Sequence, residues 1–196
     1  MGFNTMASGE TSFALGNYAS ATGATSVAIG YSTVAPSAFE TVIGICNTNY
    51  TPSSSAYWDA NDRLFVIGNG SSNSSRSNAV TVLKNGRVGL GTHAPNRLLH
   101  VYGIANPRIL VESPEQAPEL NLQRGSTTHA LYVNGNFDLV FYCAGDKMAL
   151  TDDGNVGIGT SAPNYKLDVR GTIGNNTTLY HSDKRWKNNI VPLKYG

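Results

Sequence analysis

Residues 23–30 read "GATSVAIG", one copy of a seven-residue pattern that fills the first 44 residues of the chain. Cut at glycine, this segment reads GFNTMAS, GETSFAL, GNYASAT, GATSVAI, GYSTVAP and SAFETVI, with Ser37 in place of one glycine. The fifth residue after each start is small and apolar: Ala7, Ala14, Ala21, Ala28, Ala35 and then Val42. A phase kept over six units predicts a repeat architecture.

The larger apolar residues recur at twice this spacing. Side chains alternate along an extended strand, so the fourth and sixth residues after each start share one face. The bulky pairs on that face fall in every second unit, as Phe13/Leu15, Val27/Ile29 and Thr41/Ile43. The true repeat is therefore about fourteen residues long and contains two strands.

Glycine at every seventh position excludes a helix, because each interior glycine would cost about 1 kcal/mol. A coiled β-roll accommodates it: glycine makes a turn with positive φ, and alanine lets adjacent coils approach closely. Such coils bury little apolar surface in one chain. We therefore expect several chains to pack side by side, most simply three around an axis, so that each completes the core of the others.

The segment "TSVAIG" at 25–30, within Gly-x-x-Ser-x-Ala-x units, resembles the head repeat of YadA-like trimeric adhesins. The resemblance implies a left-handed parallel β-roll and a homotrimer. It covers roughly a quarter of the chain.

A second repeat follows: "NGRVGLGTHAPNRLLHVYG" at 85–103 and "DGNVGIGTSAPNYKLDVRG" at 153–171 are offset by 68 residues. Each copy predicts a turn, a short strand, a tight glycine turn, a Pro-Asn corner and a strand ending at glycine. A dinucleotide-binding loop would open a helix after its glycines, whereas Pro95 and Pro163 are followed by further β pattern. We expect no nucleotide cofactor, and no other cofactor.

Further short strands are predicted near 63–68, 79–84, 108–112, 119–123, 129–134, 137–143 and 147–151. In "VNGNF" at 133–137, Asn134 and Gly135 should turn two antiparallel strands. "DRLFVIGNG" and "NAVTVLKNGRVGLGT" resemble repeated stalk sequences of phage tail fibres and of surface proteins from Bacteroidetes-like bacteria. A repeat unit at each end of the predicted hairpins indicates a shaft interrupted by a small β domain.

The predicted fold is all-β: a trimeric fibre with an N-terminal parallel β-roll, short-strand shaft repeats and a small antiparallel β domain. The expected divisions are 1–46 (β-roll), 47–78 (loop and strand connector), 79–103 (first shaft repeat), 104–150 (antiparallel domain), 151–174 (second shaft repeat) and 175–196 (C-terminal segment).

The C-terminal "SDKRWKNNI" at 182–190 resembles the start of the endosialidase-type, self-cleaving intramolecular chaperone domain of phage tail spikes and fibres. The resemblance implies that Ser182 is a nucleophile and Lys187 its general base, with cleavage after His181. Lysine can act as a base only when its pKa is lowered from about 10.4. Since only fourteen residues follow Ser182, we expect this dyad to be vestigial and inactive; a charged turn is the alternative.

The remaining chemistry is sparse. A formal net charge of +1 gives no reason to expect nucleic acid as a partner. The sequence has no run of about 18 apolar residues, so we expect no membrane insertion. Cys46 and Cys143 are expected to be reduced thiols. The histidines at 93, 100, 129 and 181 lack the spacing of a metal site, so no metal is expected, although Asp152 and Asp153 beside Gly154 fit either a calcium loop or a plain turn.

The segment "NTNYTPSSSAYWD" at 47–59 holds the best candidates for binding. Tyr50, Tyr57 and Trp58 lie among small polar residues, a combination with which shallow sites take sugars. These aromatic residues could equally close the end of the β-roll.

The functional prediction is a structural, host-surface receptor-binding fibre protein of the phage tail fibre type. Its expected partners are a bacterial surface glycan or outer-membrane receptor and other tail or appendage proteins, and its expected location is the virion tail. The alternatives are a bacterial trimeric adhesin on the cell surface and a fibre that carries glycan-degrading activity. A large catalytic domain is not evident, so we expect no enzyme.

Overall fold

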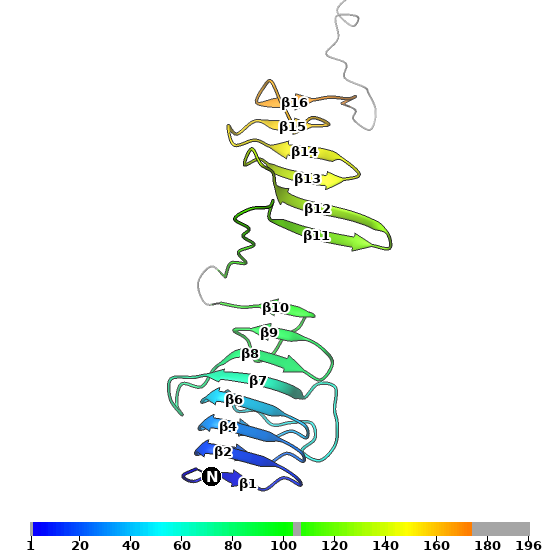
Figure 1. The fold of residues 1–196 in the computed structure, drawn as a ribbon. Coiled ribbons are helices and arrows are strands. Elements are labelled where there is room, and N and C mark those ends of the chain that lie inside the picture. The colour runs from blue at the N-terminus through cyan, green and yellow to red at the C-terminus, as the bar shows by residue number, and fades with distance from the viewer. Residues whose placement is uncertain (1, 104–106, 174–196) are drawn as a thin grey trace, which may run out of the picture. The chain divides into compact units, whose positions relative to one another are not determined.

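The computed structural model describes residues 2–103 and 107–173, and all of its regular elements are β-strands (Figure 1). The chain divides into two compact units, Met1–Arg108 and Ile109–Gly196. Among the residues described, no helix is long and apolar enough to cross a membrane. The predicted all-β fold is confirmed.

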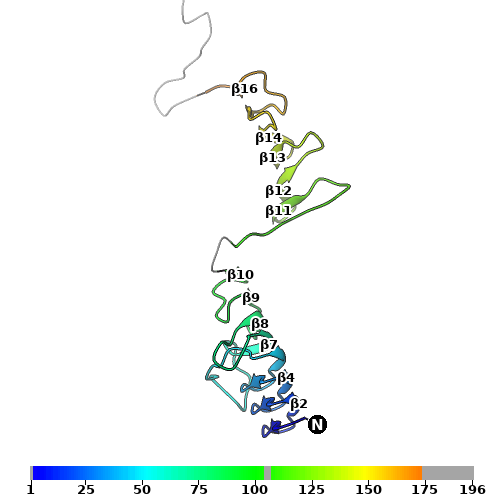
Figure 2. The ribbon, with the colours of Figure 1, turned by 90° about the vertical axis from the view of Figure 1, so that its left-hand side faces the viewer.

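The first unit begins with a parallel β-roll, in which the chain passes alternately between two sheets (Figures 1 and 2). Strands β1 (Met6–Ala7), β3 (Ser20–Ala21) and β5 (Val34–Ala35) form one sheet. Strands β2 (Phe13–Asn17), β4 (Val27–Tyr31) and β6 (Thr41–Ile45) lie in the other. Phe13 pairs with Val27, and Val27 with Thr41, which confirms the fourteen-residue repeat of two strands.

The core of the roll is narrow and contains most of the small residues predicted from the repeat, together with Ala19 and Val66, which were not predicted; Ala7, which was predicted, is exposed. The side chains that pack together inside are Ala19, Ala21, Ala28, Ala35, Val42 and Val66, with Ala14 against them. Alanines contribute little hydrophobic stabilisation, because stabilisation scales with the apolar area buried, at roughly 25 cal/mol per Å². The roll therefore has little internal apolar burial for its length.

The repeated glycines are required for contact between coils. A Cβ on Gly30 would lie 1.9 Å from the carbonyl oxygen of Gly44, and a Cβ on Gly23 would lie 2.0 Å from that of Ser37. The expectation that glycine makes the positive-φ turn is only partly right: Gly16, Gly30 and Gly44 have positive φ but lie within strands β2, β4 and β6, and Gly2, Gly9 and Gly23 do not have positive φ. Each turn instead has a left-handed residue that is not glycine, two positions after the residue that starts each seven-residue unit. These residues are Asn4, Thr11, Tyr18, Thr25, Ser32, Phe39 and Cys46.

Ser37 breaks the glycine column where the stacking on that edge ends. The next seven-residue unit is absent, and the chain instead leaves the roll as a loop over residues 47–62, the cyan trace beside the strands in Figure 1. The Ser37 hydroxyl donates a hydrogen bond to the Arg63 carbonyl at 3.1 Å. A side chain at position 37 therefore forms a contact, whereas the equivalent positions Gly9 and Gly23 in the earlier coils have no room for one.

The larger sheet of the roll continues beyond residue 46. Strand β7 (Arg63–Asn69) adds parallel to β6, and β8 (Asn78–Leu83) and β9 (Val88–Leu90) follow as antiparallel neighbours. Strand β10 (Leu99–Val101) then pairs in parallel with β9. The resulting seven-stranded sheet has the order β10-β9-β8-β7-β6-β4-β2.

The second unit is a six-stranded sheet with its strands in chain order. These are β11 (Glu119–Arg124), β12 (Thr127–Val133), β13 (Leu139–Cys143), β14 (Asp146–Leu150), β15 (Val156–Ile158) and β16 (Leu167–Val169). Asn134 and Gly135 lie in the turn between antiparallel β12 and β13, as predicted, although the left-handed residue there is Phe137. The strand predicted at 108–112 is wrong, because within the described residues that segment has no strand beside it to share backbone hydrogen bonds.

The two copies of the repeat at 85–103 and 153–171 have the same structure. In each, two short strands pair in parallel, Val88 with Leu99 and Val156 with Leu167. The likeness extends two strands back, which the sequence comparison did not reveal. The central row across β7 to β10 is Val66, Thr81, Gly89 and His100, and its counterpart across β13 to β16 is Val140, Ala149, Gly157 and Asp168. The repeated module thus has four strands.

One face of each sheet carries two unbroken rows of mostly apolar side chains, which we call the apolar face. In the first unit the rows are Phe13–Val27–Thr41–Phe65–Val82–Val88–Leu99 and Leu15–Ile29–Ile43–Ile67–Val80–Leu90–Val101. In the second they are Val133–Leu139–Leu150–Val156–Leu167 and Leu120–Leu131–Phe141–Met148–Ile158–Val169. Many of these side chains are exposed, including Phe13 at 51% and Leu120 at 55%.

Candidate functional site

Buried charged groups attach the loop at 47–62 to the β-roll. The Asp62 carboxylate accepts hydrogen bonds from the backbone N–H groups of Ser53 and Ser54, at 2.7 and 2.9 Å. The Arg63 guanidinium donates to both the carbonyl and the hydroxyl oxygen of Thr48, at 2.7 Å each. It also lies 3.9 Å above the ring of Tyr50, a cation–π contact that holds the aromatic side chain in place.

Glu40 is completely buried beneath this loop. Its Oε2 atom accepts hydrogen bonds from the Ser37 N–H at 3.0 Å and the Tyr50 hydroxyl at 3.2 Å, while Oε1 has no partner. Burial raises the pKa of the Glu40 carboxyl from 4.5 to about 7, against the opposing effects of the Ser37 hydrogen bond and the charge of Arg63. Burial likewise lowers the pKa of Arg63. At neutral pH the Glu40 carboxyl is therefore only partly ionised, so its negative charge does not fully balance the positive charge of Arg63.

This pKa predicts a pH-dependent stability that Glu40→Gln should remove. Because the folded state prefers protonated Glu40, stability falls as pH rises from 4.5 through about 7, by about 3 kcal/mol in total. Glutamine keeps the shape of the side chain and cannot ionise. In urea unfolding of the first unit at pH 4.5 and pH 8, we expect the variant to gain stability relative to the unmodified chain at the higher pH. An equal difference at both pH values would contradict the assignment.

A concave site of about 310 Å³, which we call the first groove, lies between the loop and the first shaft repeat. Its lining residues are Tyr50, Asn61, Arg63, Leu83, Arg87, His93, Ala94, Pro95 and Asn96. Arg87 and His93 are exposed, whereas Arg63 is only 2% exposed. The lining contains two arginines and no carboxylate, so the groove is cationic.

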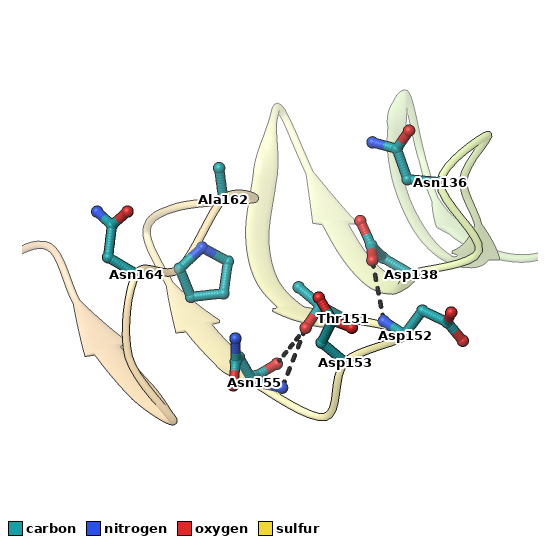
Figure 3. Close-up of a pocket in the computed structure, with 9 residues that line it drawn as sticks. Asn136, Asp138, Thr151, Asp152, Asp153, Asn155, Ala162 and Asn164 are labelled. Carbon is teal, nitrogen blue, oxygen red and sulfur yellow. Dashed lines mark hydrogen bonds between the residues drawn. The ribbon is translucent and has the colours of Figure 1, made fainter.

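A second groove, of about 370 Å³, lies in the second unit (Figure 3). Its lining residues are Asn136, Asp138, Thr151, Asp152, Asp153, Asn155, Ala162, Pro163 and Asn164. The Asp138 carboxylate, 6% exposed, accepts hydrogen bonds from the Asp152 N–H at 3.1 Å and the Asn134 amide at 3.0 Å. The lining contains three aspartates and no cation, so this groove is acidic.

The two grooves occupy equivalent places in the four-stranded module. Matching the strand registers pairs Asn61 with Asn136, Arg63 with Asp138, Leu83 with Thr151, Arg87 with Asn155, Ala94 with Ala162, Pro95 with Pro163 and Asn96 with Asn164. The asparagines, alanine and proline are kept, and the buried charge is reversed. The fold therefore requires the common frame but neither set of charges.

The structure separates the three predicted binding aromatics. Tyr50 is half-buried within the Glu40–Arg63 cluster and lines the first groove. Tyr57 and Trp58 are 78% and 60% exposed, further along the same loop. The alternative role, closing the end of the roll, fits the contacts of Tyr50.

The other predicted site residues are placed as follows. Asp152 and Asp153 form the turn before β15, and no cluster of three potential metal ligands occurs among the described residues. Cys46 is buried, and Cys143 lies 3.8 Å from the Nε2 atom of His129 across the β12–β13 pair; both cysteines are free. The predicted Ser182–Lys187 dyad lies outside the described residues.

Sequence reasoning did not identify Glu40, Arg63, Arg87 or His93. One signal was present: the last unit of the roll reads SAFE where an earlier one reads GATS, so that both Ser37 and Glu40 depart from the pattern. Ser37 forms a hydrogen bond with Arg63, the first residue of β7, and Glu40 forms one with Tyr50 of the loop at 47–62. A break in a regular repeat marked the place where the loop attaches.

Comparison with known proteins identifies a family match within the β-roll. The family model of the YadA head domain repeat matches residues 1–35, in two copies. A search of curated protein sequences found no match. The matched segment contains β1 to β5, and together with the β-roll it fits an extracellular, trimeric, adhesin-like fibre.

Proposed function

We propose that this chain is a homotrimeric, adhesin-like fibre protein that binds a receptor on a cell surface. The observation that carries this proposal is the apolar face. It extends over all seven strands of the first large sheet and all six of the second, and many of its side chains are exposed in a single chain. Large contiguous apolar surfaces on proteins mark places where another molecule packs.

Identical chains are the natural partner for this face. Because its core is made largely of alanine, the roll buries little apolar surface within one chain. The larger apolar side chains lie on the apolar face, where Phe13 pairs with Val27 and Leu15 with Ile29, and a second chain can bury them. An arrangement around a threefold axis allows the same face of every chain to point inward. The match to the head repeat of trimeric YadA-like proteins at 1–35 supports three copies.

Within this class we propose a phage tail fibre. The proposal rests on the resemblance of "DRLFVIGNG" and "NAVTVLKNGRVGLGT" to fibre stalks, and of "SDKRWKNNI" to the start of a self-cleaving chaperone domain with Ser182 and Lys187 as its dyad. Its receptor would be a bacterial surface glycan or an outer-membrane protein. A bacterial trimeric adhesin at the cell surface is the alternative, which the match to the YadA head repeat favours.

Binding and catalysis can be tested together. The labelled full chain is incubated with a panel of bacteria and with polysaccharides extracted from their surfaces, and both bound protein and released reducing ends are measured. We expect saturable binding to particular surfaces without release of reducing ends. Release of reducing ends would instead support the glycan-degrading alternative, and no binding to any surface would contradict the receptor-binding role.

A further inference from the structure

We propose that the first groove binds the carboxylate of an acidic saccharide, with Arg87 and His93 as its direct contacts. This inference rests on the proposed receptor-binding function and names the ligand chemistry and the residues for it. The volume of about 310 Å³ is at the lower end of the range of roughly 300–1,000 Å³ usual for small-molecule sites. It suits one sugar unit of a longer chain.

The charge of the groove selects an anion. Arg87 and His93 present their side chains to solvent, and no aspartate or glutamate lines the groove. An arginine fork can hold both oxygens of a carboxylate, which makes arginine the preferred partner of that group. The N–H groups of Arg87 and His93 are therefore exposed, and no carboxylate of the lining is there to accept their hydrogen bonds.

Buried Arg63 strengthens this preference from beneath. Its guanidinium is held by Thr48 and stacked on Tyr50, so it cannot turn outward, but its charge acts through a poorly hydrated interior. The nearest opposing acid that affects it is Glu40, whose pKa of about 7 leaves it partly protonated at neutral pH. Arg63 and Arg87 therefore give the lining itself a positive charge, which no lining carboxylate offsets.

The rest of the lining suits a sugar better than a bare inorganic anion. The amides of Asn61 and Asn96 offer donors and acceptors for hydroxyl groups, and Leu83 and Pro95 add apolar surface. The exposed Tyr57 and Trp58 lie in the segment between two lining residues, Tyr50 and Asn61. Exposed aromatic rings of this kind can pack against sugar units.

The second groove provides an internal comparison. It keeps Asn136, Ala162, Pro163 and Asn164 in the same frame, yet it carries Asn155 where the first groove has Arg87 and Ser161 where the first repeat has His93. The module thus folds without either of these two side chains. Arg87 and His93 are accordingly free to serve binding, and the substitutions Arg87→Asn and His93→Ser use residues that the module already accommodates.

The test compares the full chain with the double variant R87N/H93S and with the control R97A, which removes an exposed arginine of the same repeat that does not line the groove. The probes are polygalacturonate fragments, the matching neutral galactose oligosaccharides, and sodium sulfate as a simple anion. Binding is measured by calorimetry at low and at physiological salt.

We expect the acidic fragments to bind at least tenfold more tightly than the neutral ones, and more weakly at higher salt. R87N/H93S should lose at least tenfold in affinity, and R97A should stay within twofold. Equal binding of acidic and neutral fragments, sulfate binding as tight as that of the fragments, or an unaffected double variant would overturn the proposal. If R87N/H93S still binds bacterial surfaces like the unmodified chain, the groove assignment fails while the receptor-binding function stands.

Discussion

Replacing Gly30 with alanine is expected to unfold the β-roll. The new Cβ would lie 1.9 Å from the carbonyl oxygen of Gly44, far inside van der Waals contact, and both groups belong to backbone that is fixed on each side by strand pairing. Gly30 also has a φ of +129°, which L side chains rarely adopt. Together, overpacking and backbone strain predict a loss of about 4 kcal/mol.

Gly86→Ala is the matched control for this prediction. Gly86 has a positive φ of +84°, but nothing lies within 4 Å of its Cβ position, so only backbone strain is added there. Hydrogen exchange of peptides from residues 13–45, followed by mass spectrometry, measures the stability of the roll. We expect strongly increased exchange in G30A and little change in G86A. Similar exchange in the two variants would show that strain, and not contact between coils, explains the glycine column.

The second large effect is expected from Ile29→Lys, which places a charge in the middle of the apolar face. Ile29 lies between Leu15 and Ile43 in one of the two rows of the apolar face. It is 36% exposed in a single chain, so a lysine side chain at this position can reach solvent without unfolding that chain. In a trimer the substitution would bury three unpaired ammonium groups against one another. We expect a cost on the order of 4 kcal/mol per chain and dissociation into monomers at micromolar concentration.

Leu98→Lys is the control for this variant, because Leu98 is an apolar residue of the same size that is more exposed, at 76%, and lies outside both rows of the apolar face. It should leave the assembly unchanged. Sedimentation of the two variants under identical conditions makes the comparison. An I29K protein that sediments like the unmodified chain would show that the face is not the surface through which copies associate.

Most of the β-roll could be predicted because its repeat records the structure directly. The spacing of alanine and of the bulky pairs determines which residues face inward, and the register of Phe13 with Val27 follows from it. The position of the left-handed turns could not be predicted in this way. Tyr18 and Phe39 adopt positive φ although such residues are rare in that conformation, because the adjacent glycine columns fix the path of each coil.

The candidate site was harder to predict, because its residues are distant in sequence. Glu40, Tyr50 and Arg63 meet only after the loop folds back over the roll, and no local pattern connects them. The grooves became visible only when the strand registers aligned Arg63 with Asp138, since the hairpin between β7 and β8 is longer than that between β13 and β14. A comparison at a fixed offset of 68 residues could not match these two positions.

If the apolar faces of identical chains pack against one another, the protein is a trimer in solution. The most direct test is the mass of the unmodified chain in solution, measured by light scattering as it elutes from a size-exclusion column. We predict a mass of three times 20.8 kDa that persists on dilution. A stable, folded monomer of 20.8 kDa would contradict the account, because the exposed rows would then have no partner.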